Sequence, residues 1–188
     1  MLYYFFKIYL KLTGWKATGP VPHDLKKFVM IVGPHTNSAD VFMGFAFRSV
    51  LKLTYIKFIA KQELFKPPFG FLFRLAGGVP VDRFNKNNFV DQVADMFSKN
   101  TSFAIALSPE GTRKKVERLR TGFYHIAKKA DVPIVMLAFD FEHKEFRFAP
   151  AFFTTENEAL DFNKILTFFA PVKGKNVGLG MEHLLSPK

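Results

Sequence analysis

The sequence predicts an α/β fold in which a mostly parallel central sheet is flanked by helices and preceded by an N-terminal amphipathic helix. Short, almost continuous apolar runs alternate along the chain with longer helical segments, which is typical of parallel strands joined by helices. The 188 residues are 48% hydrophobic, which is enough for one core. Because no internal repeat or low-complexity tract interrupts the sequence, we expect an N-terminal segment, residues 1–26, and a single domain, residues 27–188.

Residues 2–12 form the predicted amphipathic helix. This segment is apolar except for Lys7 and Lys11, which lie four residues apart and therefore share one face of a helix. A helix needs roughly 20 apolar residues to cross a bilayer, and the sequence has no such run. Since no acidic residue precedes Asp24, we expect the segment to lie on an anionic membrane surface. The alternative is a terminal helix that packs onto its own domain.

Five strands and four helices are expected in the rest of the chain. The strand candidates are apolar runs of the kind found in sheets that are covered on both faces: residues 28–32, 55–60, 78–81, 103–107 and 133–139. The helix candidates are residues 40–51, 87–98, 121–130 and 156–168. Residues 145–153 are expected to add a short antiparallel hairpin at an edge of the sheet.

The composition restricts the partners of the chain. Lysine and arginine total 27 against 16 acidic residues, which gives a net charge of +11 at pH 7. This balance favours a polyanionic partner, and charge alone leaves nucleic acid, an anionic membrane and a phosphorylated substrate open. The 25 phenylalanines favour contact with lipid or an apolar ligand. The absence of cysteine excludes disulfides, thiolate zinc sites and a cysteine nucleophile.

His35 and Asp40 are the candidate catalytic residues. They lie in a segment that follows a predicted buried strand and opens an apolar helix, where open α/β sheets place their sites. A turn can bring the imidazole and the carboxylate together, although five residues of separation keep them off one helix face. A carboxylate on one imidazole nitrogen fixes the tautomer and leaves the other nitrogen to take a proton from an alcohol.

Four ordered motifs place this pair in a wider pattern. The chain contains His35-x4-Asp40, Gly-Gly-Val-Pro-Val-Asp-Arg at 77–83, Ser-Pro-Glu-Gly-Thr-Arg at 108–113 and Val-Pro-Ile-Val at 132–135. In order and spacing they resemble the glycerolipid acyltransferase family typified by 1-acylglycerol-3-phosphate acyltransferases, as short bacterial-type members, over residues 28–140. The resemblance implies that 27–188 is an acyltransferase domain and that His35 and Asp40 are its catalytic dyad. It also implies that Arg83, Glu110, Gly111 and Arg113 bind the acyl acceptor and its phosphate. We add Lys61 and Thr112 to this predicted set.

The residue types fit this assignment. Arg83 and Arg113 each end a loop after an apolar strand, so two planar guanidinium groups can converge on one phosphate. Lys61, just past residues 55–60, is a third candidate. Gly111 lets the backbone approach a ligand closely, although Pro-Glu-Gly alone is also a common turn. The sequence departs from the family pattern at Pro34, where many members have asparagine, and at Ser108, where an aromatic or apolar residue is usual.

The reaction that the resemblance implies is direct acyl transfer. His35 takes the proton of the acceptor hydroxyl, which attacks the thioester of acyl-CoA or acyl-carrier-protein without an acyl-enzyme intermediate. The acceptor is 1-acylglycerol-3-phosphate, and phosphatidate is the product. We expect no cofactor and no metal, because the sequence has no dinucleotide fingerprint, phosphate loop, nucleophile elbow or cluster with metal-ligand spacing.

Two other functions stay open. The first is an acyltransferase for another lysophospholipid or an amino-acid-based lipid, since the motifs determine the reaction better than the acceptor. The second is a basic binding module on membranes or nucleic acid without catalysis. Because the aromatics lie in core-like segments and the basic residues are dispersed, we expect no nucleic-acid partner. We expect a peripheral membrane protein on the cytoplasmic face of the inner membrane.

Overall fold

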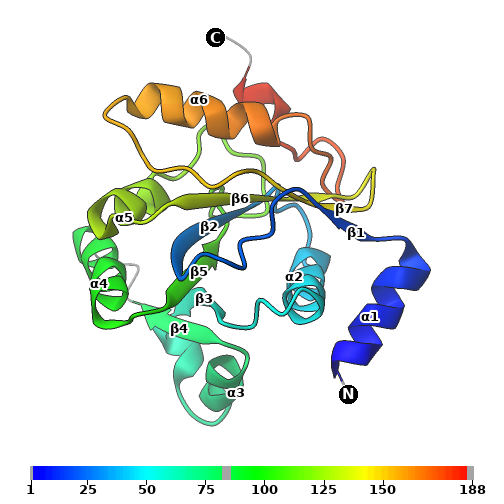
Figure 1. Cartoon of the computed structure of the whole chain (residues 1–188), viewed down its shortest axis with the longest axis horizontal. Coiled ribbons are helices and arrows are strands. Elements are labelled where there is room, and N and C mark those ends of the chain that lie inside the picture. The colour runs from blue at the N-terminus through cyan, green and yellow to red at the C-terminus, as the bar shows by residue number, and fades with distance from the viewer. Residues whose placement is uncertain (1, 82–85, 186–188) are drawn as a thin grey trace.

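A seven-stranded sheet forms the centre of the computed structural model, which describes residues 2–81 and 86–185 (Figure 1). The strands run in the order β1-β7-β6-β2-β5-β3-β4. All neighbouring pairs are parallel except β6 and β7, which are antiparallel. The strands are β1 (Lys16–Thr18), β2 (Lys27–Gly33), β3 (Ile56–Lys61), β4 (Gly78–Val81), β5 (Phe103–Leu107), β6 (Ile134–Asp140) and β7 (Glu145–Phe148).

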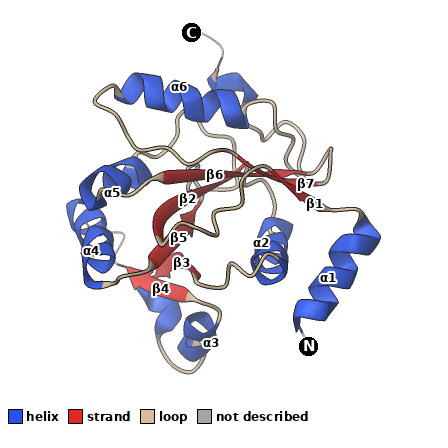
Figure 2. Cartoon of the chain, viewed as in Figure 1, coloured by secondary structure: helices blue, strands red, loops and turns tan. Residues whose placement is uncertain are grey.

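Helices cover both faces of this sheet (Figures 1 and 2). One hydrophobic cluster packs α1 and α2 against one face, and a second packs α4, α5 and α6 against the other. The short η1 and α3 lie beside β4, in the connection between β3 and β4. The helices are α1 (Leu2–Thr13), α2 (Ala39–Val50), η1 (Gln62–Phe65), α3 (Gly70–Leu75), α4 (Lys86–Lys99), α5 (Gly122–Ala130), α6 (Glu158–Phe169) and η2 (Glu182–Leu184).

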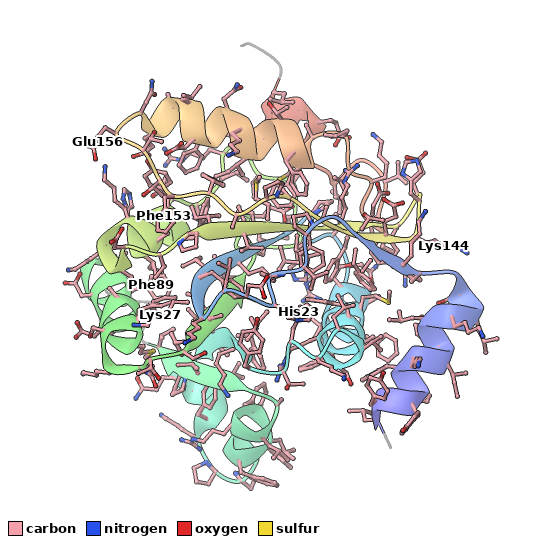
Figure 3. The ribbon with its side chains drawn as sticks, in the orientation of Figure 1. His23, Lys27, Phe89, Lys144, Phe153 and Glu156 are labelled. Atoms are coloured by element: carbon pink, nitrogen blue, oxygen red, sulfur yellow. The ribbon has the colours of Figure 1, made fainter. Side chains whose placement is uncertain are left out.

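Alternation of side chains along the central strands divides the core into these two clusters. In β2, Val29 and Ile31 join the cluster under α4, α5 and α6, whereas Phe28 and Met30 join the cluster under α1 and α2. Because both faces are covered, the strand reads as one apolar run, which is why the sequence predicts it well. Lys27, at the start of β2, donates a 2.8 Å hydrogen bond to the carbonyl oxygen of Phe97 in α4 (Figure 3).

Parallel pairing brings the ends of β2 and β5 to one edge of the sheet. Ile31 is in register with Leu107, the last residue of β5. The segment after β2 therefore lies beside the segment after β5, at the edge where open α/β sheets place their ligand sites. On the other side of β5, Lys61 of β3 is in register with Val81 of β4, so the ends of β3 and β4 lie together at one edge of the sheet.

The predicted fold class is confirmed. All five predicted strands and four predicted helices are present, with ends that shift by at most two residues. Residues 145–148 are antiparallel to β6 as expected, but the expected edge position is wrong, because β1 pairs with the outer side of β7. The sequence did not indicate β1, η1 or α3. The division at residue 26 stays a prediction, and β1, on its N-terminal side, belongs to the sheet.

The N-terminal helix α1 is present, with one face buried against the domain and the other face exposed. Phe6 and Leu10 are buried against α2, while Lys7 and Lys11 are exposed. Its other side exposes large apolar residues: Leu2, Tyr4, Phe5, Ile8 and Leu12. Among the residues that the structure describes, no helix has both the length and the apolar character needed to cross a membrane.

Candidate active site

The loop between β2 and α2 brings the predicted dyad together. His35 Nδ1 lies 3.0 Å from Asp40 Oδ2, and this contact leaves the other ring nitrogen, Nε2, available. No residue within 2–81 or 86–185 bonds to Nε2. The His35 side chain is 27% exposed, whereas Asp40 is buried in the first turn of α2. The geometry is that of a carboxylate-oriented imidazole.

Asp40 also organises the loop itself. Its Oδ2 accepts backbone N–H bonds from Thr36, at 2.8 Å, and from Asn37, at 2.9 Å. Asn37 in turn accepts the amide of Ala39 through its side-chain oxygen, at 2.9 Å, which closes a turn before α2. A buried carboxylate is tolerated when hydrogen bonds replace its lost hydration. Here the amides of the loop supply those bonds, so the loop and the dyad form one structure.

Glu110, from the loop after β5, holds the opposite side of His35. Its Oε2 accepts the backbone N–H of His35 at 2.6 Å and lies 3.3 Å from Ser108 Oγ. Glu110 is only 2% exposed. Burial raises the pKa of its carboxyl, and the bonds from His35 and Ser108 oppose that shift. Glu110 was predicted to bind the acceptor; the structure shows this carboxylate bonded to the catalytic loop, and the predicted role in binding stays a prediction.

The other predicted binding residues lie in the loop after β5, at the end of β3, or outside the described residues. Gly111 has a positive φ of 67°, which its lack of a side chain permits, and the Arg120 side chain packs against it. Arg113 is exposed in the same loop, and Thr112 Oγ1 accepts the backbone N–H of Lys114 at 3.3 Å. Lys61 is the last residue of β3. Arg83 lies outside the described residues. The binding roles of these residues stay predictions.

An apolar cavity of about 610 Å³ opens beside the dyad, within the range of about 300 to 1,000 Å³ that is typical of small-molecule sites. His35 and Asp40 are among the residues that line it. The remaining lining is mostly apolar and comes from α2, β3, α3 and β5, and it includes Val41, Phe45, Phe58, Leu72, Phe73, Ala76 and Leu107. The sequence did not reveal this cavity, because its lining residues come from several separate segments.

Arg48 is a further cavity residue that the sequence did not single out. Its guanidinium donates to the carbonyl oxygens of Ala76, at 2.7 Å, and Thr54, at 3.1 Å, and lies over the ring of Phe45. Burial lowers its pKa. Gly77 packs so close that a Cβ there would lie 2.7 Å from Arg48 Nη2. Arg48 thus ties α2 to the connection between α3 and β4 and closes part of the cavity wall.

Three groups at the turn between β6 and β7 have the spacing of metal ligands. Atoms of Asp140, Glu142 and His143 lie within 4.8 Å of one another. However, Asp140 already accepts the backbone N–H groups of Glu142 and His143 and lies 2.9 Å from His143 Nδ1. The hydrogen bond to Asp140 raises the pKa of His143. These contacts are those of a capped turn, and they assign no metal to the site.

The raised pKa of Glu110 predicts a pH dependence of stability. In the window between the ordinary glutamate pKa and the raised one, the folded chain binds more protons here than the unfolded chain, so this contribution to the free energy of unfolding falls as pH rises. We expect the difference in free energy of unfolding between wild type and Glu110→Gln to fall through this window. Urea unfolding at a series of pH values measures it, with the exposed Glu117→Gln as control. A difference that rises with pH would contradict the assigned direction.

Comparisons with known proteins agree with the fold and the motifs. A family model described as Acyltransferase matches residues 17–140. The 1-acyl-sn-glycerol-3-phosphate acyltransferase of Haemophilus influenzae is 27% identical over 142 residues, which cover 71% of this chain and 58% of that protein. The Escherichia coli protein of the same name is 28% identical over 131 residues, 66% of this chain and 52% of that protein. The Cocos nucifera protein of that name is 36% identical over 97 residues, 47% and 31% of the two chains.

The structural comparison supports the same fold. The crystal structure of the 1-acyl-sn-glycerophosphate acyltransferase from Thermotoga maritima matches with a TM-score of 0.54 and 17% sequence identity, over 100% of this chain and 79% of that chain. The chain spans about half the length of the two bacterial relatives named above. Because the family model matches about two thirds of the sequence, from β1 to the end of β6, the chain belongs to the Acyltransferase family.

Proposed function

We propose that the chain transfers a fatty acyl group from acyl-CoA or acyl-carrier-protein to the free hydroxyl of 1-acylglycerol-3-phosphate, which yields phosphatidate. The observation that carries this proposal is the His35–Asp40 pair in the lining of an apolar cavity. The dyad supplies a base for a hydroxyl, and the cavity suits an acyl chain. The names of the sequence relatives support the same acceptor.

In the proposed reaction, His35 Nε2 takes the proton of the acceptor hydroxyl. The oxygen attacks the thioester carbonyl carbon, the carbon–sulfur bond breaks, and the leaving thiolate receives the proton from the imidazolium. Asp40 stabilises the imidazolium that forms in between. General-base catalysis of this kind contributes about 10²- to 10⁴-fold, and the positioning of two bound substrates supplies much of the rest. No cofactor takes part in this scheme.

The acceptor phosphate is proposed to bind at the exposed side of the site. Arg113 lies in the loop that also carries Glu110, and Glu110 contacts the backbone of His35. A guanidinium matches two phosphate oxygens at once, which makes Arg113 the best-placed described candidate. Lys61 and Arg83 are proposed as further contacts, since Lys61 ends β3 and Arg83 comes two residues after the end of β4 in the sequence.

Replacing His35 tests the chemistry. We expect His35→Ala to abolish turnover and to stay folded, because the side chain is partly exposed and lies in a loop. Asp40→Asn is expected to lower kcat more than it weakens binding, since an amide does not stabilise the imidazolium. Steady-state rates, circular dichroism and intact mass after incubation with acyl-CoA measure these effects. A folded, fully active His35→Ala chain would overturn the mechanism, and an acyl adduct that passes to added acceptor would replace direct attack.

Replacing Arg113 tests the phosphate site. We expect Arg113→Ala to raise the KM for 1-acylglycerol-3-phosphate roughly tenfold or more, because a charge-assisted contact is worth about 1.5 to 3 kcal/mol. The KM for acyl-CoA should change much less. Arg118→Ala is the matched control, since Arg118 is exposed in the same loop. Equal acceptor kinetics in the two variants would place the phosphate elsewhere, and a preference for a lysolipid without this phosphate would change the acceptor.

We also propose that the chain binds an anionic membrane surface as a peripheral protein, which would bring the site to its lipid substrates. The exposed apolar side of α1, with Lys7 and Lys11, has the composition of an interfacial helix. The short α3 exposes a second apolar group, Phe69, Phe71, Leu72 and Leu75, with the exposed Lys66 and Arg74. Leu72 also lines the cavity, so this surface and the site are continuous. The assignment to the cytoplasmic face of the inner membrane stays a prediction.

Substitutions on the outer face of α1 test this binding. Deleting the helix would uncover α2, because Phe6 and Leu10 are buried against it, so the double variant Phe5→Glu/Ile8→Glu is preferable. We expect its binding to anionic vesicles to fall about tenfold or more, since two apolar side chains no longer enter the lipid. Wild-type binding should weaken with salt. Val177→Glu, at an exposed position of another segment, is the control in vesicle sedimentation. Unchanged binding by the double variant would refute the role of α1.

A further inference from the structure

The segment after α6 contacts the catalytic loop from outside the part of the chain that the family model matches. Asn176 is 36 residues beyond the end of that match at residue 140. Its side-chain Nδ2 donates to the carbonyl oxygen of Thr36 at 2.9 Å, and its Oδ1 accepts Nδ2 of Asn37 at 3.0 Å. Its backbone N–H donates to Thr36 Oγ1 at 3.1 Å. One residue therefore makes three hydrogen bonds to two consecutive residues of the loop.

These two loop residues are the ones that hold the catalytic carboxylate. The backbone N–H groups of Thr36 and Asn37 both donate to Asp40 Oδ2, the oxygen that also contacts His35 Nδ1. A displacement of their peptide groups would move or release Asp40 Oδ2, and with it the ring of His35. Asn176 therefore does not contact the dyad itself. It contacts the two loop residues whose N–H groups bond to Asp40.

Contacts with the core hold the rest of the segment beside the loop. The backbone N–H of Phe141, just past β6, donates to the carbonyl oxygen of Lys173 at 2.9 Å, and Val172 is buried in the core. A Cβ on Gly174 would lie 2.6 Å from Thr36 Cγ2, so the backbone approaches the loop as closely as only glycine permits. Thr36 itself is 2% exposed. The segment is thus anchored to the core before it meets the loop.

We propose that Asn176 is a positioning residue for the His35–Asp40 dyad. This inference rests on the proposed acyl transfer, and it adds a residue that the four motifs do not contain. The Asn176 side chain holds the Thr36 carbonyl, whose peptide group carries the N–H of Asn37, and it holds the Asn37 side chain. The N–H of Asn37 bonds to Asp40, and Asp40 orients His35. Asn176 does not touch the reacting atoms.

Asn176 can be replaced without disturbing the core. Asn176 is exposed, so Asn176→Ala leaves no hole in the core, and the bond from its backbone N–H to Thr36 Oγ1 can persist. Asn176→Asp keeps an oxygen for Asn37 Nδ2 but has no N–H for the Thr36 carbonyl oxygen. Asn100→Ala is the matched control, because Asn100 is also exposed and its Nδ2 donates to a backbone carbonyl, that of Met96 at 2.7 Å, at the end of α4.

Steady-state kinetics with acyl-CoA and 1-acylglycerol-3-phosphate give the first readout. We expect Asn176→Ala and Asn176→Asp to lower kcat about tenfold or more, since a displacement of about 1 Å at a reacting group can cost about 100-fold. The KM of each substrate should stay within about twofold of wild type, because the binding groups are untouched. Circular dichroism should show the same fold, and Asn100→Ala should match wild type. Wild-type kcat in either Asn176 variant would overturn the assignment.

Nuclear magnetic resonance of the imidazole nitrogens gives a second readout that needs no turnover. His35 is assigned by its absence from the spectrum of His35→Ala. We expect wild type to hold the His35 proton mostly on Nδ1, facing Asp40, and Asn176→Ala to shift rings toward the other tautomer. An unchanged tautomer ratio would refute the inference even if the chain proves to use other substrates. Loss of transfer in wild type with the expected tautomer shift in Asn176→Ala would refute only the proposed reaction.

Discussion

One oxygen atom, Oδ2 of Asp40, is the point on which the catalytic loop depends. It accepts two N–H bonds from the loop backbone, at 2.8 and 2.9 Å, and lies 3.0 Å from Nδ1 of the His35 ring. A carboxylate this buried needs such donors, because desolvation without them costs several kcal/mol. The contacts that make its burial tolerable are therefore the contacts that set the His35 ring. Glu110 accepts the backbone N–H of His35. Two buried carboxylates, each in a segment that follows a different strand, therefore hold one turn between them, and we call this arrangement the clamp.

The clamp depends on parallel strands, and the parallel arrangement of the strands could be predicted from the sequence. Apolar runs covered on both faces identify β2, β5 and β6 with little ambiguity, and the segments after neighbouring parallel strands must meet at one edge. The meeting of the His35 loop with the Glu110 loop also needs β2 and β5 to be neighbours, and the structure supplies that strand order. The contact between His35 and Asp40 follows from the sequence, since only five residues separate them and a turn suffices to join them.

The remaining features could not be predicted, for physical reasons that differ between them. The strand β1 has three residues and no apolar run, and its pairing with β7 alone defines it. The six-residue α3 is too short for helical periodicity to show. The bond from Glu110 to His35 joins a side chain to a backbone N–H, and no residue pattern encodes such an acceptor. Asn176 meets Thr36 across 140 residues in a connection without regular structure, where periodicity carries no information.

The position of the apolar cavity relative to the clamp constrains how the proposed reaction is arranged. The cavity lining is mostly apolar, which suits an acyl chain, and the guanidinium of Arg48 in its wall is already bonded to the carbonyl oxygens of Ala76 and Thr54. In the proposed arrangement the phosphate lies toward the exposed Arg113, in the loop that also carries Glu110. An acyl group in the cavity and a phosphate at that loop leave the reacting hydroxyl between them, beside Nε2. In that proposed arrangement the apolar wall would keep water from the thioester and would strengthen the attraction between the imidazolium and Asp40, since charges interact more strongly where water is excluded.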